Sequence, residues 1–188
     1  LSSFKTMKLS FEQIETLSPD LTWGKGVESL GAHQPSLGLK HWLTETTLLT
    51  DKIRQLQHKH SIEVLNEYHG PVPRLLKNSQ TEQNNFIREI LLSIDKQACV
   101  LAQTIVPRKT LEQNGWIKTL GAQPLGEHLL KKTNVSRSEF EYSYLEHSMS
   151  PFWLRRSSFN IDKAMLWVIE LFLPAIEAYT DDQNKGLL

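Results

Sequence analysis

The sequence has little of what marks secreted, membrane-spanning or nucleic-acid-binding proteins. It contains one cysteine, Cys99, which excludes an internal disulfide, and the apolar alternation around it predicts a buried, reduced thiol rather than a nucleophile. No apolar run approaches the roughly 18 residues that a membrane-spanning helix needs, and no basic stretch precedes an apolar one at the N-terminus. We therefore expect a soluble, cytoplasmic protein.

An excess of charge of either sign is also absent. The 21 Lys and Arg residues balance 21 Asp and Glu residues, which leaves no overall field to attract nucleic acid or an anionic membrane. His58 and His60 end a predicted helix without a nearby cysteine or matching carboxylates, so the sequence predicts no metal site. We expect neither a nucleic-acid partner nor a bound metal.

A length of 188 residues suits one domain. We predict a monomer whose single domain spans 1–188, with an N-terminal arm or loop over 1–35 and a disordered tail over 180–188. The tail is predicted from its run of polar and charged residues.

Hydrophobic periodicity predicts helices and strands in alternation. Apolar residues recur at helical spacing from Leu39 to Leu56, with Ser36 available as an N-cap, which predicts one helix. Shorter helices are predicted over 110–120 and 124–130. Period-two alternation predicts six strands, over 62–68, 86–94, 98–106, 138–146, 153–161 and 165–173. Since these strands are joined mainly as hairpins, we expect an α+β fold with a single six-stranded antiparallel sheet flanked by helices.

Two opposite charges, Arg88 and Glu170, lie in the middle of otherwise apolar strands. Burying either one alone would cost roughly several kcal/mol, so both need compensation. One interpretation is that the two side chains pair with each other or reach the surface. The other is that they line an enclosed polar spot, where an arginine fork holds a ligand carboxylate and the glutamate holds a hydroxyl. The two interpretations can coexist.

Other segments suit a pocket for an anionic ligand. Pro124-Leu125-Gly126 presents backbone amides at a helix start, although this pattern is also ordinary helix punctuation. Arg155 and Arg156 lie on opposite faces of their strand, so we expect one to point inward or toward an edge and the other to be solvated. The glycine-rich and polar segments 24–38 and 71–85 are candidate covers.

At these residues the chain resembles a known family, the chorismate lyases. Each matching block is short, but in this order, and with an ungapped spacing from Arg155 to Pro174, the blocks are specific together. The resemblance covers roughly 88–179. The blocks are Arg88-Glu89-Ile90-Leu91-Leu92, Thr104-Ile105-Val106-Pro107, Leu120-Gly121 with Pro124-Leu125-Gly126, Arg155-Arg156-Ser157 and Glu170-Leu171-Phe172-Leu173-Pro174.

The resemblance implies an antiparallel sheet flanked by helices and an enzyme that needs no metal or organic cofactor. The implied reaction removes pyruvate from chorismate to leave 4-hydroxybenzoate, for quinone or related aromatic biosynthesis. Its small-molecule partners are therefore chorismate, 4-hydroxybenzoate and pyruvate.

The resemblance also assigns roles to residues. Arg88 resembles the family's ligand of the ring carboxylate, Glu170 the group on the 4-hydroxyl, and Leu125 a backbone contact. Leu49 stands where the enterobacterial family member has Met, so we expect it in the pocket wall. Leu154 replaces a family glycine beside the paired arginines, which puts the local geometry in question.

Two functions agree with the same fold and pocket. One is the chorismate lyase activity, and the alternative is a non-catalytic sensor or carrier of an aromatic acid. The family's fold also occurs in effector-binding domains of GntR-type transcription regulators, but we expect no room for a winged DNA-binding part in a chain of this length. A free-standing enzyme is the better interpretation, and turnover of chorismate separates the two because both predict binding of 4-hydroxybenzoate.

Overall fold

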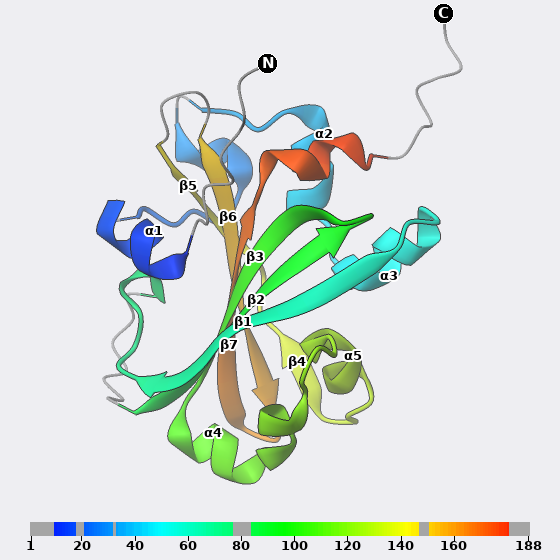
Figure 1. Cartoon of the computed structure of the whole chain (residues 1–188). Coiled ribbons are helices and arrows are strands. Elements are labelled where there is room, and N and C mark those ends of the chain that lie inside the picture. The colour runs from blue at the N-terminus through cyan, green and yellow to red at the C-terminus, as the bar shows by residue number, and fades with distance from the viewer. Residues whose placement is uncertain (1–9, 18–20, 32, 77–83, 147–150, 181–188) are drawn as a thin grey trace, which may run out of the picture.

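An antiparallel sheet forms the centre of the structure, a computed structural model that describes residues 10–17, 21–31, 33–76, 84–146 and 151–180. The described residues form seven strands in the order β1-β2-β3-β7-β6-β4, and β5 pairs with β6 beside β4 (Figure 1). The strands are β1 His60–Gly70, β2 Asn85–Ile94, β3 Gln97–Val106, β4 Val135–Arg137, β5 Glu141–Leu145, β6 Phe152–Ile161 and β7 Ala164–Phe172. The tail predicted to be disordered falls, from residue 181 on, outside the described residues.

The predicted α+β architecture with an antiparallel sheet is confirmed, and the predicted number of six strands is wrong by one. The additional strand is β4, which pairs with the end of β6 through Val135 and Ile161. β4 is three residues long, too short for an alternating pattern to stand out in the sequence.

Both predicted hairpins close through two-residue turns that lack glycine. Asp95 and Lys96 have φ values of 47° and 72°, and Asp162 and Lys163 have 50° and 69°. Two successive residues with positive φ are the geometry of a type I′ turn, whose twist matches that of the strands. Side-chain hydrogen bonds support both turns, since Asp95 Oδ1 accepts the Lys59 N–H at 3.0 Å and Asp162 Oδ1 accepts from the Asn134 amide at 2.8 Å.

The helices form layers on the two faces of the sheet. The α-helices are α1 Phe11–Leu17, α2 Leu37–Leu43, α3 Leu49–Gln55, α4 Arg108–Gln113 and α5 Leu125–Leu130. Short 3-10 helices are η1 Val27–Leu30, η2 Arg74–Leu76, η3 Gly115–Thr119 and η4 Pro174–Ala178. Figure 1 shows α1 on one side of the sheet and α3 and α5 on the other.

The prediction of one helix from Leu39 to Leu56 is wrong, because the chain breaks between α2 and α3. Ser36 does cap α2, since its hydroxyl accepts the Leu39 N–H at 3.1 Å. The break lies at Glu45, whose carboxylate accepts both the N–H and the hydroxyl of Thr47 at 2.8 Å. Such local side-chain bonds compete with the helical ones.

Three clusters of buried apolar side chains hold the layers together. One cluster packs α1 and η2 against one face of the sheet, through residues such as Phe11 and Leu171. The other two lie on the opposite face: α2, α3 and η4 cover one end of it, and α4, η3 and α5 cover the other end. We call this second face the pocket face, because the space between its two clusters holds a cavity.

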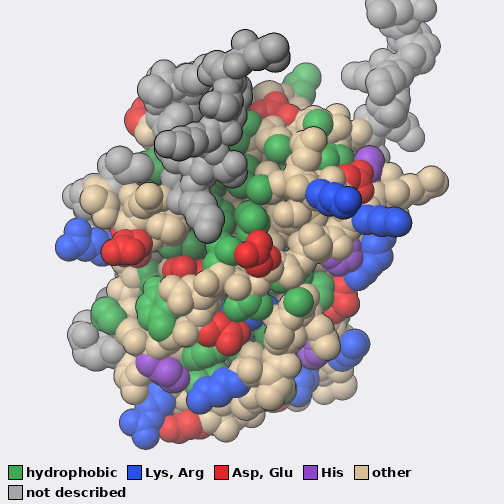
Figure 2. Space-filling view, in the orientation of Figure 1, with side chains coloured by type: hydrophobic (Ala, Val, Ile, Leu, Met, Phe, Trp, Pro, Cys, Tyr) green, Lys and Arg blue, Asp and Glu red, His purple; other side chains and the backbone are tan. Residues whose placement is uncertain are grey.

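Acidic and basic side chains are interspersed on the side of the molecule shown in Figure 2, where neither sign gathers into a patch. Among the described residues, no helix combines the length and the hydropathy needed to cross a membrane. Cys99 is buried, as predicted, and burial raises the pKa of its thiol to about 11.

Candidate functional site

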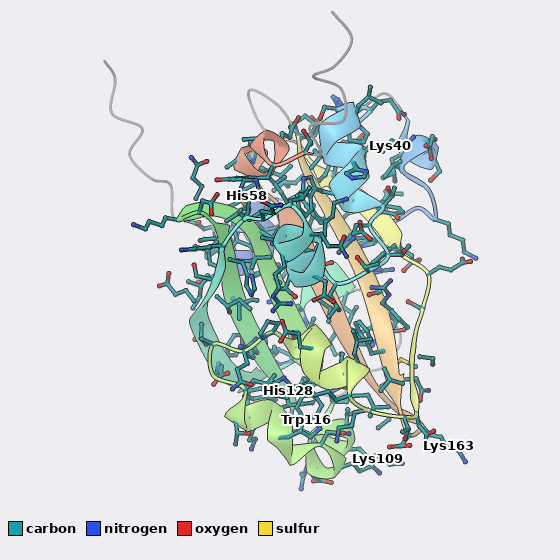
Figure 3. All side chains as sticks on the ribbon, turned by 90° about the vertical axis from the view of Figure 1, so that its right-hand side faces the viewer. Lys40, His58, Lys109, Trp116, His128 and Lys163 are labelled. Atoms are coloured by element: carbon teal, nitrogen blue, oxygen red, sulfur yellow. The ribbon has the colours of Figure 1, made fainter. Side chains whose placement is uncertain are left out.

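The cavity on the pocket face has a volume of about 110 Å³. Its floor consists of side chains from β2, β3, β7 and β6, and its cover consists of the start of α3 and the start of α5, which stand in front of the sheet in Figure 3. Most of the wall is apolar, with residues such as Leu49, Ile90 and Phe140. A small apolar cavity with a few polar groups is typical of a binding site for a small organic molecule.

The register of the sheet brings Arg88 and Glu170 to the same face. Arg88 on β2 is opposite Thr104 on β3, and Glu170 on β7 is opposite Ala102 on β3. Because Ala102 and Thr104 are two residues apart, their side chains share a face, and both predicted residues therefore line the one cavity.

Arg88 is nearly inaccessible to solvent, at 2% exposure, and is incompletely paired. Its Nη2 donates to the Gly121 carbonyl oxygen, and its Nε lies 3.3 Å from Glu67 Oε1 on the neighbouring strand. The contact of Arg88 Nε with Glu67 is an ion pair and not a hydrogen bond. The buried Nε–H of Arg88 therefore has no hydrogen-bond acceptor among the described residues. Burial lowers the pKa of Arg88, and the charge of Glu67 partly opposes that shift.

Glu170 is paired with Arg155, so the interpretation that Arg88 and Glu170 pair with each other is wrong. Arg155 Nε lies 2.5 Å from Glu170 Oε2 across the β6–β7 pair. This contact occupies Oε2, whereas Oε1 has no hydrogen-bond partner among the described residues, and Glu170 lines the cavity. Arg155 therefore balances the charge of Glu170 while the carboxylate keeps an acceptor free for a ligand.

Arg155 also fixes the loop that forms part of the cover. Its Nη1 lies within hydrogen-bonding distance of the carbonyl oxygens of Trp42, Leu43 and Glu45, at 3.3, 3.1 and 2.8 Å. These carbonyls belong to the end of α2 and the segment after it, beyond the regular hydrogen bonds of the helix, although Trp42 O also accepts the Glu45 N–H at 3.3 Å. One guanidinium thus joins the catalytic candidate Glu170 to the break between α2 and α3.

The two halves of the cover touch each other. A Cβ atom on Gly126 would collide with Leu48 Cδ2, so glycine allows the start of α5 to approach the start of α3 closely. Arg54 of α3 forms an ion pair with Glu127 of α5, and the Thr50 hydroxyl lies 3.4 Å from the same carboxylate. The hydrogen bond from Arg54 is the main reason that the pKa of Glu127 is lowered, and burial partly opposes it.

The outer side of α5 is held by an aromatic stack. The imidazole of His128 lies parallel to the Trp116 ring, with centroids 5.6 Å apart and planes at 11°, and the two are labelled side by side in Figure 3. Trp116 belongs to η3, so this stack connects α5 to the apolar cluster beneath it.

The structure places all four sequence-predicted site residues at this cavity. Arg88, Glu170, Leu125 and Leu49 line it together, whereas the described residues of the candidate covers 24–38 and 71–85 contribute no lining residue. Residues 32 and 77–83 of these covers lie outside the described residues. The expectation that one of Arg155 and Arg156 is solvated is wrong, because their exposures are 2% and 6%.

Sequence reasoning missed several lining residues. Ser157 and Thr104 place hydroxyl groups in the wall, Phe140 supplies an aromatic face, and Arg137 adds a further cation. Alternation along β6 could have assigned Ser157 to the same face as Arg155. Arg137 gives no such signal because β4 is so short.

The cavity is thus chemically asymmetric. Among the described lining residues, the cations Arg88, Arg137 and Arg155 outnumber the one carboxylate, Glu170, and the rest of the wall is mainly apolar. This combination suits a small, flat, anionic molecule with a hydroxyl group. Within the ranges that the structure describes, no group of three or more His, Cys, Asp or Glu side chains is arranged to hold a metal ion.

Comparison with known proteins identifies relatives along most of the chain. The sequence profile of the family described as chorismate lyase matches residues 20–183. A probable chorismate pyruvate-lyase of Pseudoalteromonas atlantica is 29% identical over 181 residues, which cover 86% of this chain and 91% of the relative. A probable chorismate pyruvate-lyase of Vibrio vulnificus is 31% identical over 146 residues, with coverage of 75% and 81%. The chorismate pyruvate-lyase of Pectobacterium carotovorum is 25% identical over 182 residues, with coverage of 93% and 97%.

Solved structures show a related fold. The effector domain of PhnF from Mycobacterium smegmatis superposes with a TM-score of 0.52, covering 70% of this chain and 91% of that domain. The sequence identity is 11%, so the likeness concerns the fold and does not extend to the ligand.

Proposed function

This chain belongs to the chorismate lyase family, and we propose that it eliminates pyruvate from chorismate to leave 4-hydroxybenzoate. The observation that supports this most directly is the joint placement of Arg88 and Glu170 in one apolar cavity. Chorismate carries a ring carboxylate and, opposite to it, a hydroxyl group, which are the two groups that a buried arginine and a glutamate recognise.

The substrate's ring lies across the sheet in this proposal. Arg88 on β2 binds the ring carboxylate with the donors that its protein partners leave unused, and the backbone N–H of Leu125 assists from the cover. Glu170 on β7, separated from β2 by β3 alone, accepts the hydrogen bond of the 4-hydroxyl. Leu49 and the other apolar residues hold the ring between them and exclude water.

The reaction requires little from the protein beyond this placement. The carbon that bears the hydroxyl loses its hydrogen as a proton, and the bond between the neighbouring carbon and the ether oxygen breaks. The ring becomes aromatic, which makes the step strongly favourable. The enolpyruvate that leaves takes up a proton at its methylene carbon and becomes pyruvate. Catalysis then consists mainly of holding the reactive conformer with oriented charges.

The direct test is a product assay. Purified protein incubated with chorismate should release pyruvate and 4-hydroxybenzoate in equal amounts, faster than the spontaneous reaction. The rate should be unchanged by excess chelator, since the proposal routes no step through a metal. Binding of 4-hydroxybenzoate without any turnover of chorismate would instead identify a sensor or carrier of an aromatic acid.

A further inference from the structure

Chorismate has a second carboxylate, on the enolpyruvyl group, for which the residues considered so far provide no partner. Arg88 is assigned to the ring carboxylate and Glu170 to the hydroxyl group. An anion enclosed in an apolar cavity without a counter-charge would be costly, so the wall should contain another cation. The argument rests on the proposed function for the identity of the ligand.

Arg137 is the cation in the wall that lacks a carboxylate partner among the described residues. Arg155 has Glu170 at 2.5 Å, and Arg88 has Glu67 at 3.3 Å. Arg137 instead donates from Nη2 to the Thr46 carbonyl oxygen at 2.5 Å, and the described residues bring no Asp or Glu within ion-pair distance of it. Its guanidinium therefore retains both charge and hydrogen-bond donors.

The surroundings of Arg137 suit an anion rather than another cation. Its Cζ lies 4.5 Å from the centroid of the Phe140 ring, and the Cζ of Arg155 lies 4.2 Å from the centroid of the same ring. Burial lowers the pKa of Arg137, and the nearby positive charge of Arg155 lowers it further, while the more distant charges of Glu170 and Glu45 partly oppose the shift without pairing with Arg137. A bound carboxylate would relieve this repulsion between like charges.

The position of Arg137 in the sheet fits the shape of chorismate. From the ring carboxylate at Arg88 to the hydroxyl group at Glu170, the substrate crosses from β2 to β7, and β6 and β4 continue in the same direction. The enolpyruvyl ether leaves from the carbon next to the hydroxyl-bearing one, so its carboxylate lies near the Glu170 end of the ring, which is the end closer to β6 and β4. We propose that Arg137, at the end of β4, binds the enolpyruvyl carboxylate and thereby distinguishes chorismate from 4-hydroxybenzoate.

The experiment compares ligands with and without the second carboxylate. The unreactive probe is 3-(carboxymethoxy)-4-hydroxybenzoate, which carries an ether-linked carboxylate at the same ring position, and the reference ligand is 4-hydroxybenzoate. Arg137→Met should lower the affinity for the probe and the kcat/KM for chorismate by about 10- to 100-fold, the usual value of a charge-assisted hydrogen bond. Its affinity for 4-hydroxybenzoate should be unchanged.

Control variants separate a binding role from a structural one. Arg137→Lys keeps the charge and should retain more affinity for the probe than Arg137→Met. Lys109→Met removes one positive charge from an exposed position on α4, at the bottom of the molecule in Figure 3 and outside the cavity, and should affect neither ligand. Arg88→Met should weaken both ligands, because both carry the ring carboxylate.

The outcomes are distinct. Equal losses for the probe and for 4-hydroxybenzoate in Arg137→Met would show that Arg137 only supports the fold, and no loss for either would show that it faces no carboxylate; both results overturn the inference. A parental protein that does not convert chorismate would refute the proposed function, while the comparison of the two ligands would still test Arg137. A parental protein that binds neither ligand would refute both.

Discussion

Arg155 and Arg156 are consecutive residues on β6 that face opposite sides of the sheet with nearly the same set of partners. Arg155 pairs through Nε with Glu170 at 2.5 Å, and Arg156 pairs through Nε with Glu141 at 2.8 Å. Arg155 Nη1 donates to carbonyl oxygens at the end of α2, and Arg156 Nη1 donates to those of η2. Both guanidinium groups lie on aromatic rings, of Phe140 at 4.2 Å and of Trp23 at 4.4 Å.

The difference between the two arginines lies in what faces their glutamates. Glu170 borders the cavity and its side chain is 17% exposed, whereas Glu141 does not line that cavity and its side chain is 36% exposed. On the face of Arg156, the buried Gln103 amide nitrogen donates to Glu89 at 2.8 Å, while Gln103 Oε1 has no hydrogen-bond partner among the described residues. Both arginines are buried and paired with a glutamate, so such an ion pair does not by itself identify a functional site. The feature that distinguishes the Arg155–Glu170 pair is the cavity beside it.

The strongest test of this comparison is to neutralise each glutamate. Glu170→Gln should lower kcat/KM for chorismate by about a hundredfold or more, because it replaces the charged acceptor of the hydroxyl group with a neutral amide and breaks the ion pair with Arg155. Glu141→Gln should change it by less than about threefold, since Glu141 does not line the cavity and its partner Arg156 faces the opposite side of the sheet. Steady-state kinetics of both variants would give the answer, and equal losses would show that the two faces do not differ in function.

Removing either arginine should instead lower the free energy of unfolding of the protein. Arg155→Met leaves Glu170 without its partner and removes the side-chain donor shared by three carbonyl groups, and should lower the free energy of unfolding by about 3–5 kcal/mol. Arg156→Met should cost less, about 1–3 kcal/mol, because the exposed Glu141 can be hydrated again. Denaturant midpoints measure both costs. A smaller cost for Arg155→Met than for Arg156→Met would contradict this account of the pocket face.

The sequence predicts much of this sheet and little of its ion pairing. Six strands are long enough for an alternating pattern to be visible, and β4 is not. Parity relates residues of one strand, which is why Arg155 and Arg156 could be assigned to opposite faces. Their burial depends on the segments that cover each face, from α2 and η2, and no local pattern reports those contacts.

The candidate site shows the same limit. Arg88 and Glu170 attract attention because a charge in an apolar strand needs compensation. Glu170 is compensated by Arg155 rather than by Arg88 because the β6–β7 register pairs Arg155 with Glu170. Arg88 is farther away because β3 lies between β2 and β7. Register across several strands is a tertiary property, so this part of the site could not be predicted.

Binding of the product compares a variant on the face of Arg156, Glu141→Gln, with a variant on the pocket face, Arg88→Met. A product that is planar like the transition state should bind tightly in an enclosed cavity and inhibit the enzyme. At a concentration a hundred times its Kd, 4-hydroxybenzoate should raise the free energy of unfolding by about 2.7 kcal/mol in the parental protein and in Glu141→Gln. Arg88→Met at the same concentration should gain less. An unchanged initial rate at high product concentration would refute tight product binding.

The smallest expected effect concerns how firmly each face is covered. The cover of the opposite face, α1, is held by Phe11 and Ile14, which are 2% and 0% exposed. The two halves of the pocket cover are joined in part by the ion pair of Arg54 and Glu127, whose side chains are 47% and 29% exposed. Because an exposed ion pair is worth about 0.2–1 kcal/mol, Glu127→Gln should speed release of 4-hydroxybenzoate by about fivefold at most.

The rate at which 4-hydroxybenzoate is released should depend on pH, because the ion pair of Arg54 and Glu127 requires an ionised Glu127. The pKa of Glu127 is lowered from its ordinary value of 4.5, mainly by the hydrogen bond from Arg54, so its contribution is fully present above that value and is lost as pH falls through the lowered pKa. The parental release rate should therefore approach that of Glu127→Gln at low pH.

Glu112→Gln, which breaks the exposed pair of Arg108 and Glu112 on α4, is the matched control and should release product at the parental rate. Stopped-flow measurement of release would decide, since identical rates for parent and Glu127→Gln at neutral pH would show that this ion pair does not restrain the cover.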